Sequence, residues 1–270
     1  MDSYFSVDEI PEEQQIECLD LRCIAYDCET DTLDLADTKY ELVDKYVIEC
    51  DYAYTEENTT IKHIINIDIL NFHFCTSLTG LFYNFTALET IDGLDKINIS
   101  HLCCMEDMFE NCKSLKSIDL SNWYVGGVND MKNMFKNCVS LTSLNISNWK
   151  TYSLQCLNST FANCTSLQTL DLSEWYTIHV SDMTSTFANC TSLVELNLSN
   201  WRICEHYCYK FYMKNMFDRC NSLMVLDLSY CDNHTTSSFR NCIESLNHVE
   251  DNSFDELTII YPVNPNDKEN

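Results

Sequence analysis

Apolar residues recur along the middle of the chain at fixed places in a unit of 26 residues. Phenylalanine, cysteine and tryptophan each hold one place in four consecutive units: Phe109, Phe135, Phe161 and Phe187; Cys112, Cys138, Cys164 and Cys190; Trp123, Trp149, Trp175 and Trp201. A fifth copy begins at Phe217, 30 residues after Phe187. A unit of this length cannot bury its own apolar face and has to stack on the next unit, which predicts a solenoid.

The first half of each unit has the apolar spacing of a short helix. The i, i+3, i+4, i+7 spacing places side chains on one face of a helix, and it is found at Met131, Met134, Phe135 and Cys138. Asp130 stands just before them, where an N-cap residue would accept bonds from free backbone N–H groups. The pattern therefore predicts a helix of about two turns in each unit.

The second half of each unit predicts a short strand. Leu141, Leu144 and Ile146 form a Leu-x-x-Leu-x-Ile pattern, and Trp149 follows at a turn, where its indole would stack from coil to coil. Equivalent strands would lie parallel, about 4.8 Å apart. Weaker copies at 82–94 and 239–246 extend the array to about six or seven coils. The predicted fold is an α/β repeat solenoid with one short helix and one short parallel strand per coil, capped at both ends.

This signature resembles a known family. The pattern Met-x-x-Met-Phe-x-x-Cys-x-Ser-Leu-x-x-Leu-Asp-Leu-Ser-x-Trp, which covers about residues 80–246, is similar to the leucine-rich repeats of the bacterial-surface-protein (BspA-like) type. More narrowly, it resembles the 26-residue repeats of mycoplasma surface lipoproteins. The resemblance implies a leucine-rich-repeat-like solenoid. It also implies a surface or secreted protein that binds host proteins or matrix, as most members of that type are taken to do.

The segment before the array is strongly acidic. Residues 1–60 hold 18 acidic and 3 basic residues, so they carry −15 of the net charge of −26. Residues 10–25 favour a short amphipathic helix, while 40–54 and 61–72 favour strands. We expect this segment to cap the first coil, as solenoids require, and a separate acidic interaction domain is the alternative.

These patterns give a three-part organisation. We expect an acidic N-terminal capping region at 1–72, the leucine-rich-repeat solenoid at 73–246, and a C-terminal cap and tail at 247–270. The apolar residues 257–261 precede Pro262, so they predict a final strand that covers the last coil.

The net charge of −26 at pH 7 narrows the range of partners. An acidic surface repels the phosphates of nucleic acid and the anionic head groups of membranes. No run of 18 apolar residues is present that would span a bilayer. A basic protein partner is compatible with this charge, and so is an acidic surface that is merely solvated.

The 17 cysteines predict free thiols. Cysteines of the repeat would point the same way from successive coils, which is poor disulfide geometry, so we expect small buried hydrophobes. Cys204, His206 and Cys208 lack a fourth ligand and the usual spacing of a zinc site. The first residues have no signal-peptide pattern, so we expect a cytoplasmic location, with export to the surface by a non-classical route as the alternative.

The sequence offers no recognisable active site. Its seven histidines lie outside the repeat columns, and its four glycines leave no phosphate-binding loop. Neither a His-Glu-x-x-His motif nor a paired-carboxylate motif stands out. We therefore expect no catalytic residue, no cofactor and no metal, and a protein that is not an enzyme.

Positions between the leucines of each strand point away from the core and define a patterned face. The predicted protein-binding residues are Lys116, Ser117, Asp119, Thr142, Asn145, Gln168, Asp171, Val194, Glu195, Asn197, Met224, Val225 and Asp227. One column alternates Asp and Asn, which predicts either a structural polar ladder or a hydrogen-bonding surface for an extended partner. The neighbouring columns change from polar at Lys116 to apolar at Met224, which fits a protein-binding face but also unselected drift.

These expectations favour a non-enzymatic scaffold that binds another protein, either along the strand face or through the acidic N-terminal region. A surface or secreted adhesin-like protein is the alternative that the family resemblance implies. A virion or other structural component is a further alternative. The missing export signal and the many unpaired cysteines favour the scaffold.

Overall fold

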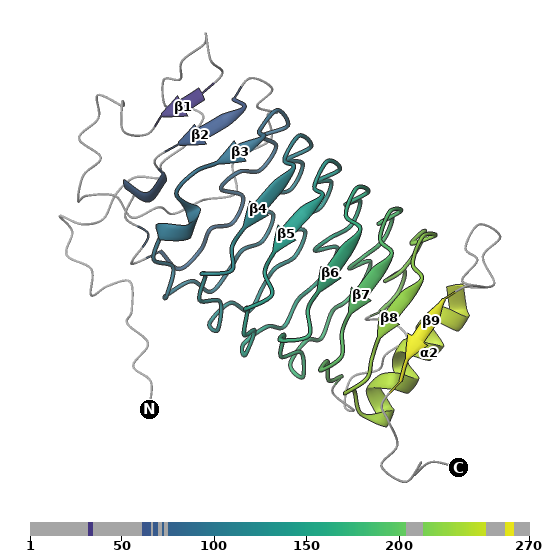
Figure 1. Cartoon of the computed structure of the whole chain (residues 1–270). Coiled ribbons are helices and arrows are strands. Elements are labelled where there is room, and N and C mark those ends of the chain that lie inside the picture. Colours follow the sequence, from purple (N-terminus) through teal and green to yellow (C-terminus); the bar gives the residue numbers. More distant parts are fainter. Residues whose placement is uncertain are drawn as a thin grey trace, which may run out of the picture.

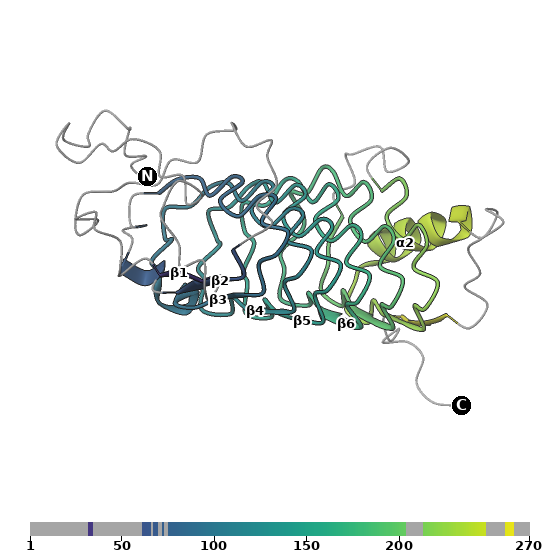
Figure 2. The ribbon, with the colours of Figure 1, turned by 90° about the horizontal axis from the view of Figure 1, so that it is seen from above.

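The chain winds into a solenoid in which each coil adds one short strand to the same side (Figure 1). The computed structural model describes residues 32–34, 61–65, 67–69, 72, 75–203, 213–246 and 257–261. The strands follow one long side of the solenoid, and turns and loops form the opposite side (Figure 2).

Nine short strands and one α-helix follow one another in this part of the chain. The strands are β1 (Thr32–Asp34), β2 (His63–Ile65), β3 (Thr90–Ile91), β4 (Ser117–Asp119), β5 (Ser143–Asn145), β6 (Thr169–Asp171), β7 (Glu195–Asn197), β8 (Val225–Asp227) and β9 (Thr258–Ile260). Helix α2 (Asn233–Leu246) stands between β8 and β9, and 3-10 helices lie at Ile67–Ile69 and Leu94–Lys96. The described helices include none that is long and apolar enough to cross a bilayer.

Every strand pair is parallel, and equivalent residues of successive units are register partners, as with Leu170, Leu196 and Leu226. The predicted parallel-strand solenoid is therefore confirmed. The strands are grouped as β1-β2-β3, β4-β5 and β6-β7-β8-β9. Among the described strands, no ladder joins β3 to β4 or β5 to β6, so the sheet is divided into three.

The helix that the spacing predicts in each unit is wrong, because turns occupy Met131–Cys138. Asn133 and Asn137 have φ angles of 53° and 62°, a left-handed conformation that a right-handed helix does not contain. The N–H of Phe135 donates to the carbonyl of Thr160 in the next coil at 2.8 Å, whereas a helix would require a carbonyl four residues earlier. Alternate N–H groups of the segment join coils in this way, and those of Met134, Lys136 and Cys138 close turns to the third residue before them.

Asp130, predicted as a helix N-cap, closes a turn instead. Its Oδ1 accepts a bond from the N–H of Lys132 at 2.8 Å, and Asp182 does the same for Thr184 at 2.8 Å. The backbone of Asp130 also forms parallel bridges with Cys104 and Cys156 of the neighbouring coils. This position is therefore a point of contact between coils.

The repeat columns form one continuous core. Phe135 is fully buried, and its ring stacks on those of Phe109 and Phe161 with centroids 5.3 and 5.8 Å away. The buried Cys138 thiol donates to the carbonyl of Phe109 at 3.2 Å, which is a bond that recurs down the cysteine column. The cysteine column is thus buried and free of disulfides, as predicted.

An asparagine ladder, which the sequence reading did not find, runs along the turn side. Asn137 Nδ2 donates to Asn111 Oδ1 at 2.7 Å, and Asn163 Nδ2 donates to Asn137 Oδ1 at 2.6 Å. The same bond links Asn84 to Asn111 and Asn163 to Asn189. All five residues have φ angles near 60°. Asn tolerates this left-handed conformation better than most residues, so one residue type meets both requirements.

The two ends of the array only partly match the prediction. Strand β2 lies within the predicted strand at 61–72, and β9 lies within the predicted strand at 257–261. The weak copy predicted at 239–246 is wrong as a coil, because these residues belong to α2. Asp232 Oδ1 accepts the N–H of Thr235 at 2.7 Å, which satisfies a free donor at the start of this helix. The helix predicted at 10–25 and the strands predicted at 40–54 lie outside the described residues.

Candidate functional site

The predicted binding face lies on the strand side, and its inward–outward alternation is confirmed. In β4 the middle residue Ile118 is buried, while Ser117 and Asp119 are exposed. Strand β6 repeats this pattern around the buried Leu170. Leu144 of β5 is the exception because it is only partly buried, next to the gap between β5 and β6.

The strand pairing brings the predicted residues together in two groups. The first group, on and beside β4 and β5, contains Lys116, Ser117, Asp119, Thr142 and Asn145. The second group, on and beside β6, β7 and β8, contains Gln168, Asp171, Val194, Glu195, Asn197, Met224, Val225 and Asp227. Since no strand ladder joins β5 to β6, the two groups do not form one continuous hydrogen-bonded surface.

The column that alternates Asp and Asn accepts a backbone N–H in the turn after β4, β6, β7 and β8, while Asn145 accepts the hydroxyl of Ser147 at 3.1 Å. Asp119 Oδ1 accepts the N–H of Ser121 at 2.9 Å, and equivalent bonds start from the serines two residues after Asp171, Asn197 and Asp227. The Ser121 N–H, its hydroxyl and the amide of Asn145 together lower the pKa of Asp119. Asn145 thus also supports the adjacent carboxylate, as the polar-ladder alternative predicts.

Lys116, at the polar end of the face, is held by the preceding coil. Its Nζ lies 2.6 Å from Oε2 of Glu89, and this bond lowers the pKa of the Glu89 carboxyl. The lysine charge is therefore already paired, and an incoming partner would have to compete with Glu89 for it.

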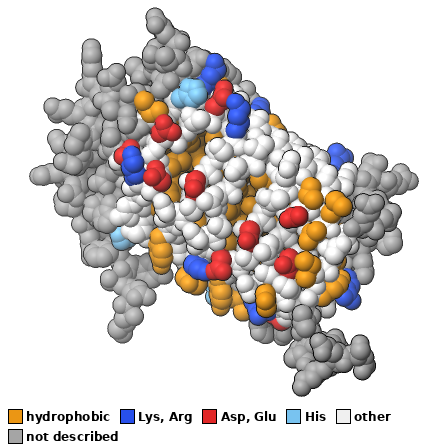
Figure 3. Space-filling view, viewed as in Figure 1, with side chains coloured by type: hydrophobic (Ala, Val, Ile, Leu, Met, Phe, Trp, Pro, Cys, Tyr) orange, Lys and Arg blue, Asp and Glu red, His pale blue; other side chains and the backbone are white. Residues whose placement is uncertain are grey.

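The other end of the face is apolar, and we call Val194, Met224, Val225, Ile260 and Tyr261 the apolar end. Met224 is 47% exposed and Ile260 is 41% exposed, while both valines are half-buried. Ile260 pairs in register with Asp227, so β9 extends the face by one strand. Arg240 of α2 lies 5.1 Å from the ring centroid of Tyr261. Figure 3 shows hydrophobic side chains gathered at this end.

The sequence reading did not include Ile260 and Tyr261 in the binding face. It predicted their strand as a cap. Because the segment departs from the repeat pattern, the sequence does not show which of its residues continue the outward columns of the sheet. The apolar run at 257–261 was the available signal.

The described residues provide little for metal or acid–base chemistry. No group of three His, Cys, Asp or Glu side chains in this part of the chain is placed to hold a metal ion. Burial raises the pKa of the Cys138 and Cys164 thiols well above their ordinary value, so both are neutral and poor nucleophiles. Cys204, His206 and Cys208 lie outside the described residues.

One protein-family model matches most of the chain. It is described as "Mycoplasma protein of unknown function, DUF285", and it matches residues 52–154, 76–201, 118–225 and 140–255 in overlapping copies. No curated protein matches the sequence.

Two solved structures are similar over much of the chain. A leucine-rich-repeat protein of Leptospira interrogans shares 12% identity over 74% of this chain and 49% of its own, with a TM-score of 0.33. A chain of the mouse RP105/MD-1 complex shares 19% identity over 81% of this chain and 40% of its own, with a TM-score of 0.34. The chain thus spans half or less of the length of these proteins.

Proposed function

The chain belongs to the family described as "Mycoplasma protein of unknown function, DUF285", and we propose that it is a non-enzymatic scaffold that binds another protein along its strand face. The apolar end is the observation that carries this proposal. Methionine and aromatic side chains are enriched in the cores of protein interfaces, and Met224 and Tyr261 stand exposed there.

Acidic side chains beside the apolar end indicate the chemistry of the partner. Glu195 is exposed on β7, and Asp227 lies between Asn197 and Ile260 in register. An apolar patch bordered by carboxylates suits a partner whose own apolar patch is bordered by Lys or Arg. The net charge of −26 would also speed the approach of such a partner.

The test is capture of a partner from an extract of the natural source, followed by chemical cross-linking. Substituting Met224→Asp together with Ile260→Asp introduces two charges into the apolar end, so the captured protein should fall at least about tenfold. The matched control is Asn122→Asp with Asn129→Asp, which adds the same charge to exposed positions outside the predicted binding face. Retained capture by the Met224/Ile260 variant would exclude the apolar end as the interface.

We also propose that residues 1–72 cap the first coil, that 73–246 form the solenoid, and that 247–270 close the other end. The pairing of β2 with β3 and of β8 with β9 supports both caps. If residues 1–72 are instead a separate interaction domain, a chain that begins at residue 73 should keep the unfolding temperature of the full chain.

The cellular compartment distinguishes the cytoplasmic scaffold from the BspA-like adhesin alternative. The cysteine column of Cys112, Cys138, Cys164, Cys190 and Cys220 contains no disulfide, which supports the scaffold. The intact mass of the protein from its natural source, with and without thiol alkylation, tests this. Seventeen alkylated thiols and no glycan mass are expected, whereas glycan mass or protected thiols would favour the adhesin.

A further inference from the structure

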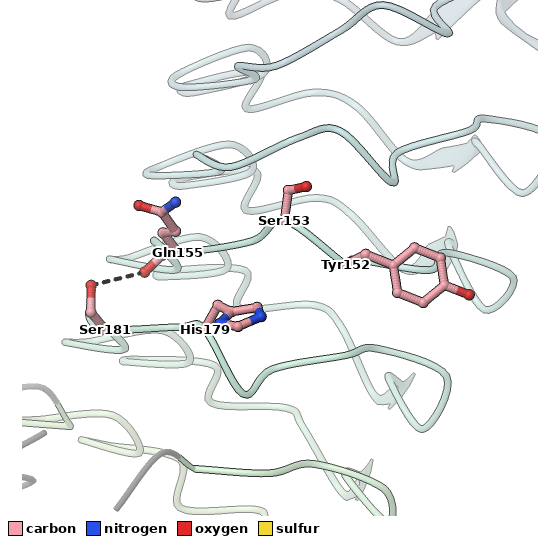
Figure 4. Close-up of a pocket in the computed structure, with 5 residues that line it drawn as sticks. All are labelled: Tyr152, Ser153, Gln155, His179 and Ser181. Atoms are coloured by element: carbon pink, nitrogen blue, oxygen red, sulfur yellow. Dashed lines mark hydrogen bonds between the residues drawn. The ribbon is translucent and has the colours of Figure 1, made fainter. Parts of the chain in front are cut away.

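A hollow of about 440 Å³ lies on another side of the solenoid, between the segments that follow Trp149 and Trp175 in successive coils. It is lined by Tyr152, Ser153, Gln155, His179 and Ser181. Figure 4 shows the first three on one coil and the last two on the next coil. Its volume falls in the range of about 300–1,000 Å³ that is common for small-molecule sites.

The backbone that carries these residues is fixed by the core. Leu154 and Val180 are buried, and their neighbours Ser153, Gln155, His179 and Ser181 therefore point to the outside. The N–H of Ser181 donates to the carbonyl of Gln155 at 2.8 Å, and its hydroxyl donates to the same carbonyl at 3.3 Å (Figure 4). The hollow is thus held in shape without a ligand.

A buried threonine ties the two coils together beside the hollow. Thr151 Oγ1 accepts the N–H of Tyr176 at 2.9 Å and donates to its carbonyl at 3.0 Å. This exchange orients the backbone of Tyr176, whose side chain stands outside next to Tyr152. The backbone that carries these aromatic side chains is therefore held in place by hydrogen bonds between the two coils.

Two lining rings, Tyr152 and His179, each lie near the exposed ring of Tyr176, which stands beside the hollow. The centroids of Tyr152 and Tyr176 lie 6.0 Å apart with planes at 56°, and those of Tyr176 and His179 lie 6.0 Å apart with planes at 59°. Tyr152 is 53% exposed. Tilted rings leave parts of their faces open to solvent, where a flat apolar group of a ligand can pack.

The lining side chains are not required by the repeat. In the preceding unit the places of Tyr152 and Ser153 are held by Gly126 and Gly127, so these places vary while the buried columns stay constant. The fold alone therefore does not explain a tyrosine, a histidine and a glutamine at one junction between coils.

Among the residues that the structure describes, no carboxylate, lysine or arginine lines the hollow. The nearest charge along the chain is that of Asp182, whose carboxylate accepts bonds from Asn158 Nδ2 and the N–H of Thr184. Lys150 and Glu174 form an ion pair with each other. The polar groups on offer are hydroxyls, an amide and an imidazole, which both donate and accept hydrogen bonds. A ligand that matches them is uncharged, rich in hydroxyl groups, and apolar on one face.

We propose that this hollow binds an uncharged sugar unit of a glycan. The C–H face of the sugar packs on Tyr152, and its hydroxyl groups bond to Gln155, His179 and Ser181. The proposal does not depend on the strand-face function, because the two surfaces share no residue.

The experiment uses the full chain and four neutral probes: chitotetraose, cellotetraose, maltotetraose and mannotetraose. Tetragalacturonate serves as a charged comparison, and an uncharged polar peptide tests a peptide ligand. Saturation-transfer NMR detects binding, and calorimetry gives the dissociation constant. We expect at least one neutral sugar to bind, and Tyr152→Ala to weaken this binding by about tenfold or more.

The matched control is Tyr230→Ala, which removes a tyrosine that is 69% exposed outside the hollow. The affinity of this variant for the sugar should stay within about twofold of that of the unsubstituted chain. Thermal unfolding of both variants checks that each is folded. The proposal is overturned if no neutral sugar binds, if only tetragalacturonate or the peptide binds, or if both tyrosine variants lose affinity equally.

Discussion

The indole of Trp149 lies against that of Trp175, with centroids 5.8 Å apart and planes 17° from parallel, yet the two are bonded differently. Trp149 Nε1 donates to the carbonyl of Leu120 in the preceding coil at 2.8 Å. Trp175 Nε1 is buried and has no hydrogen-bond partner. By the period of the repeat its acceptor would be the carbonyl of Ile146, immediately after β5. This carbonyl lies where no ladder joins the described strands β5 and β6.

This difference predicts unequal costs for one substitution at two buried sites. Trp149→Phe removes a buried hydrogen bond, whereas Trp175→Phe removes only ring volume. The first should therefore lower the free energy of unfolding by about 1 kcal/mol more than the second. Urea unfolding followed by circular dichroism measures both.

Trp201→Phe is the control, because Trp201 Nε1 also donates to a backbone carbonyl, that of Leu172, at 2.9 Å. It should behave like Trp149→Phe. Equal losses at all three sites would show that Trp175 Nε1 gains a partner in solution.

The asparagine ladder predicts an order of stability at Asn137. Asn137→Gly keeps the left-handed backbone but loses both amide bonds, while Asn137→Ala loses the bonds and also strains the backbone. The alanine variant should be less stable than the glycine variant by about 1–2 kcal/mol. Urea midpoints compare them, and an alanine variant as stable as the glycine variant would contradict a left-handed conformation at this position.

Phe161 tests the stacked core. It is fully buried between Phe135 and Phe187, with centroids 5.8 and 5.6 Å away. Phe161→Ala should destabilise the chain by roughly 3–5 kcal/mol, because a buried aromatic ring is replaced by a cavity. Substitution of the exposed Tyr230 by alanine should cost little in the same assay. A loss near zero for Phe161→Ala would mean that the column is not packed in solution.

The buried thiols predict a loss of stability at alkaline pH. Burial raises the pKa of Cys138 well above its ordinary value of 9.0, and the neighbouring Cys112 thiol adds to this rise. Above pH 9 the unfolded chain loses this proton while the folded chain keeps it, so rising pH favours unfolding. Between pH 8 and pH 10 each such thiol should cost about 1.4 kcal/mol.

Urea unfolding of the reduced protein at both pH values tests this expectation. Cys138→Ala should shrink the pH-dependent loss by the contribution of one thiol. Leu141→Ala, which truncates a buried side chain without removing a thiol, should leave that loss unchanged. An unchanged loss in the cysteine variant would show that Cys138 ionises alike in both states.

The strand, its alternation and the core columns were predictable because they depend on which residues repeat. The prediction of a helix in each unit failed, because successive turns place Met131, Met134, Phe135 and Cys138 inward with the same spacing that a helix produces. The left-handed Asn133 and Asn137 were the distinguishing residues. Asn is tolerated in that conformation and disfavoured inside helices, so the recurrence of Asn at the position of Asn137 was a readable signal.

The candidate sites were predictable only where they follow the repeat. The outward columns of β4 to β8 follow it, so Met224 and Val225 were found. Ile260, Tyr152 and His179 do not follow the repeat. Ile260 joins the strand face, and Tyr152 and His179 line one hollow, only because coils of different sequence stack. Sequence spacing alone could not reveal those contacts.

The coils that carry the asparagine ladder bond to one another through equivalent atoms, and this has a genetic consequence. A duplication or deletion of one whole unit among them would rejoin Phe to Phe, Cys to Cys and Asn to Asn, so the bonds on the turn side would find equivalent partners. Unequal recombination between neighbouring repeats would therefore yield longer or shorter proteins that still fold. The length of the strand face is then a trait that selection can adjust without inventing a new core.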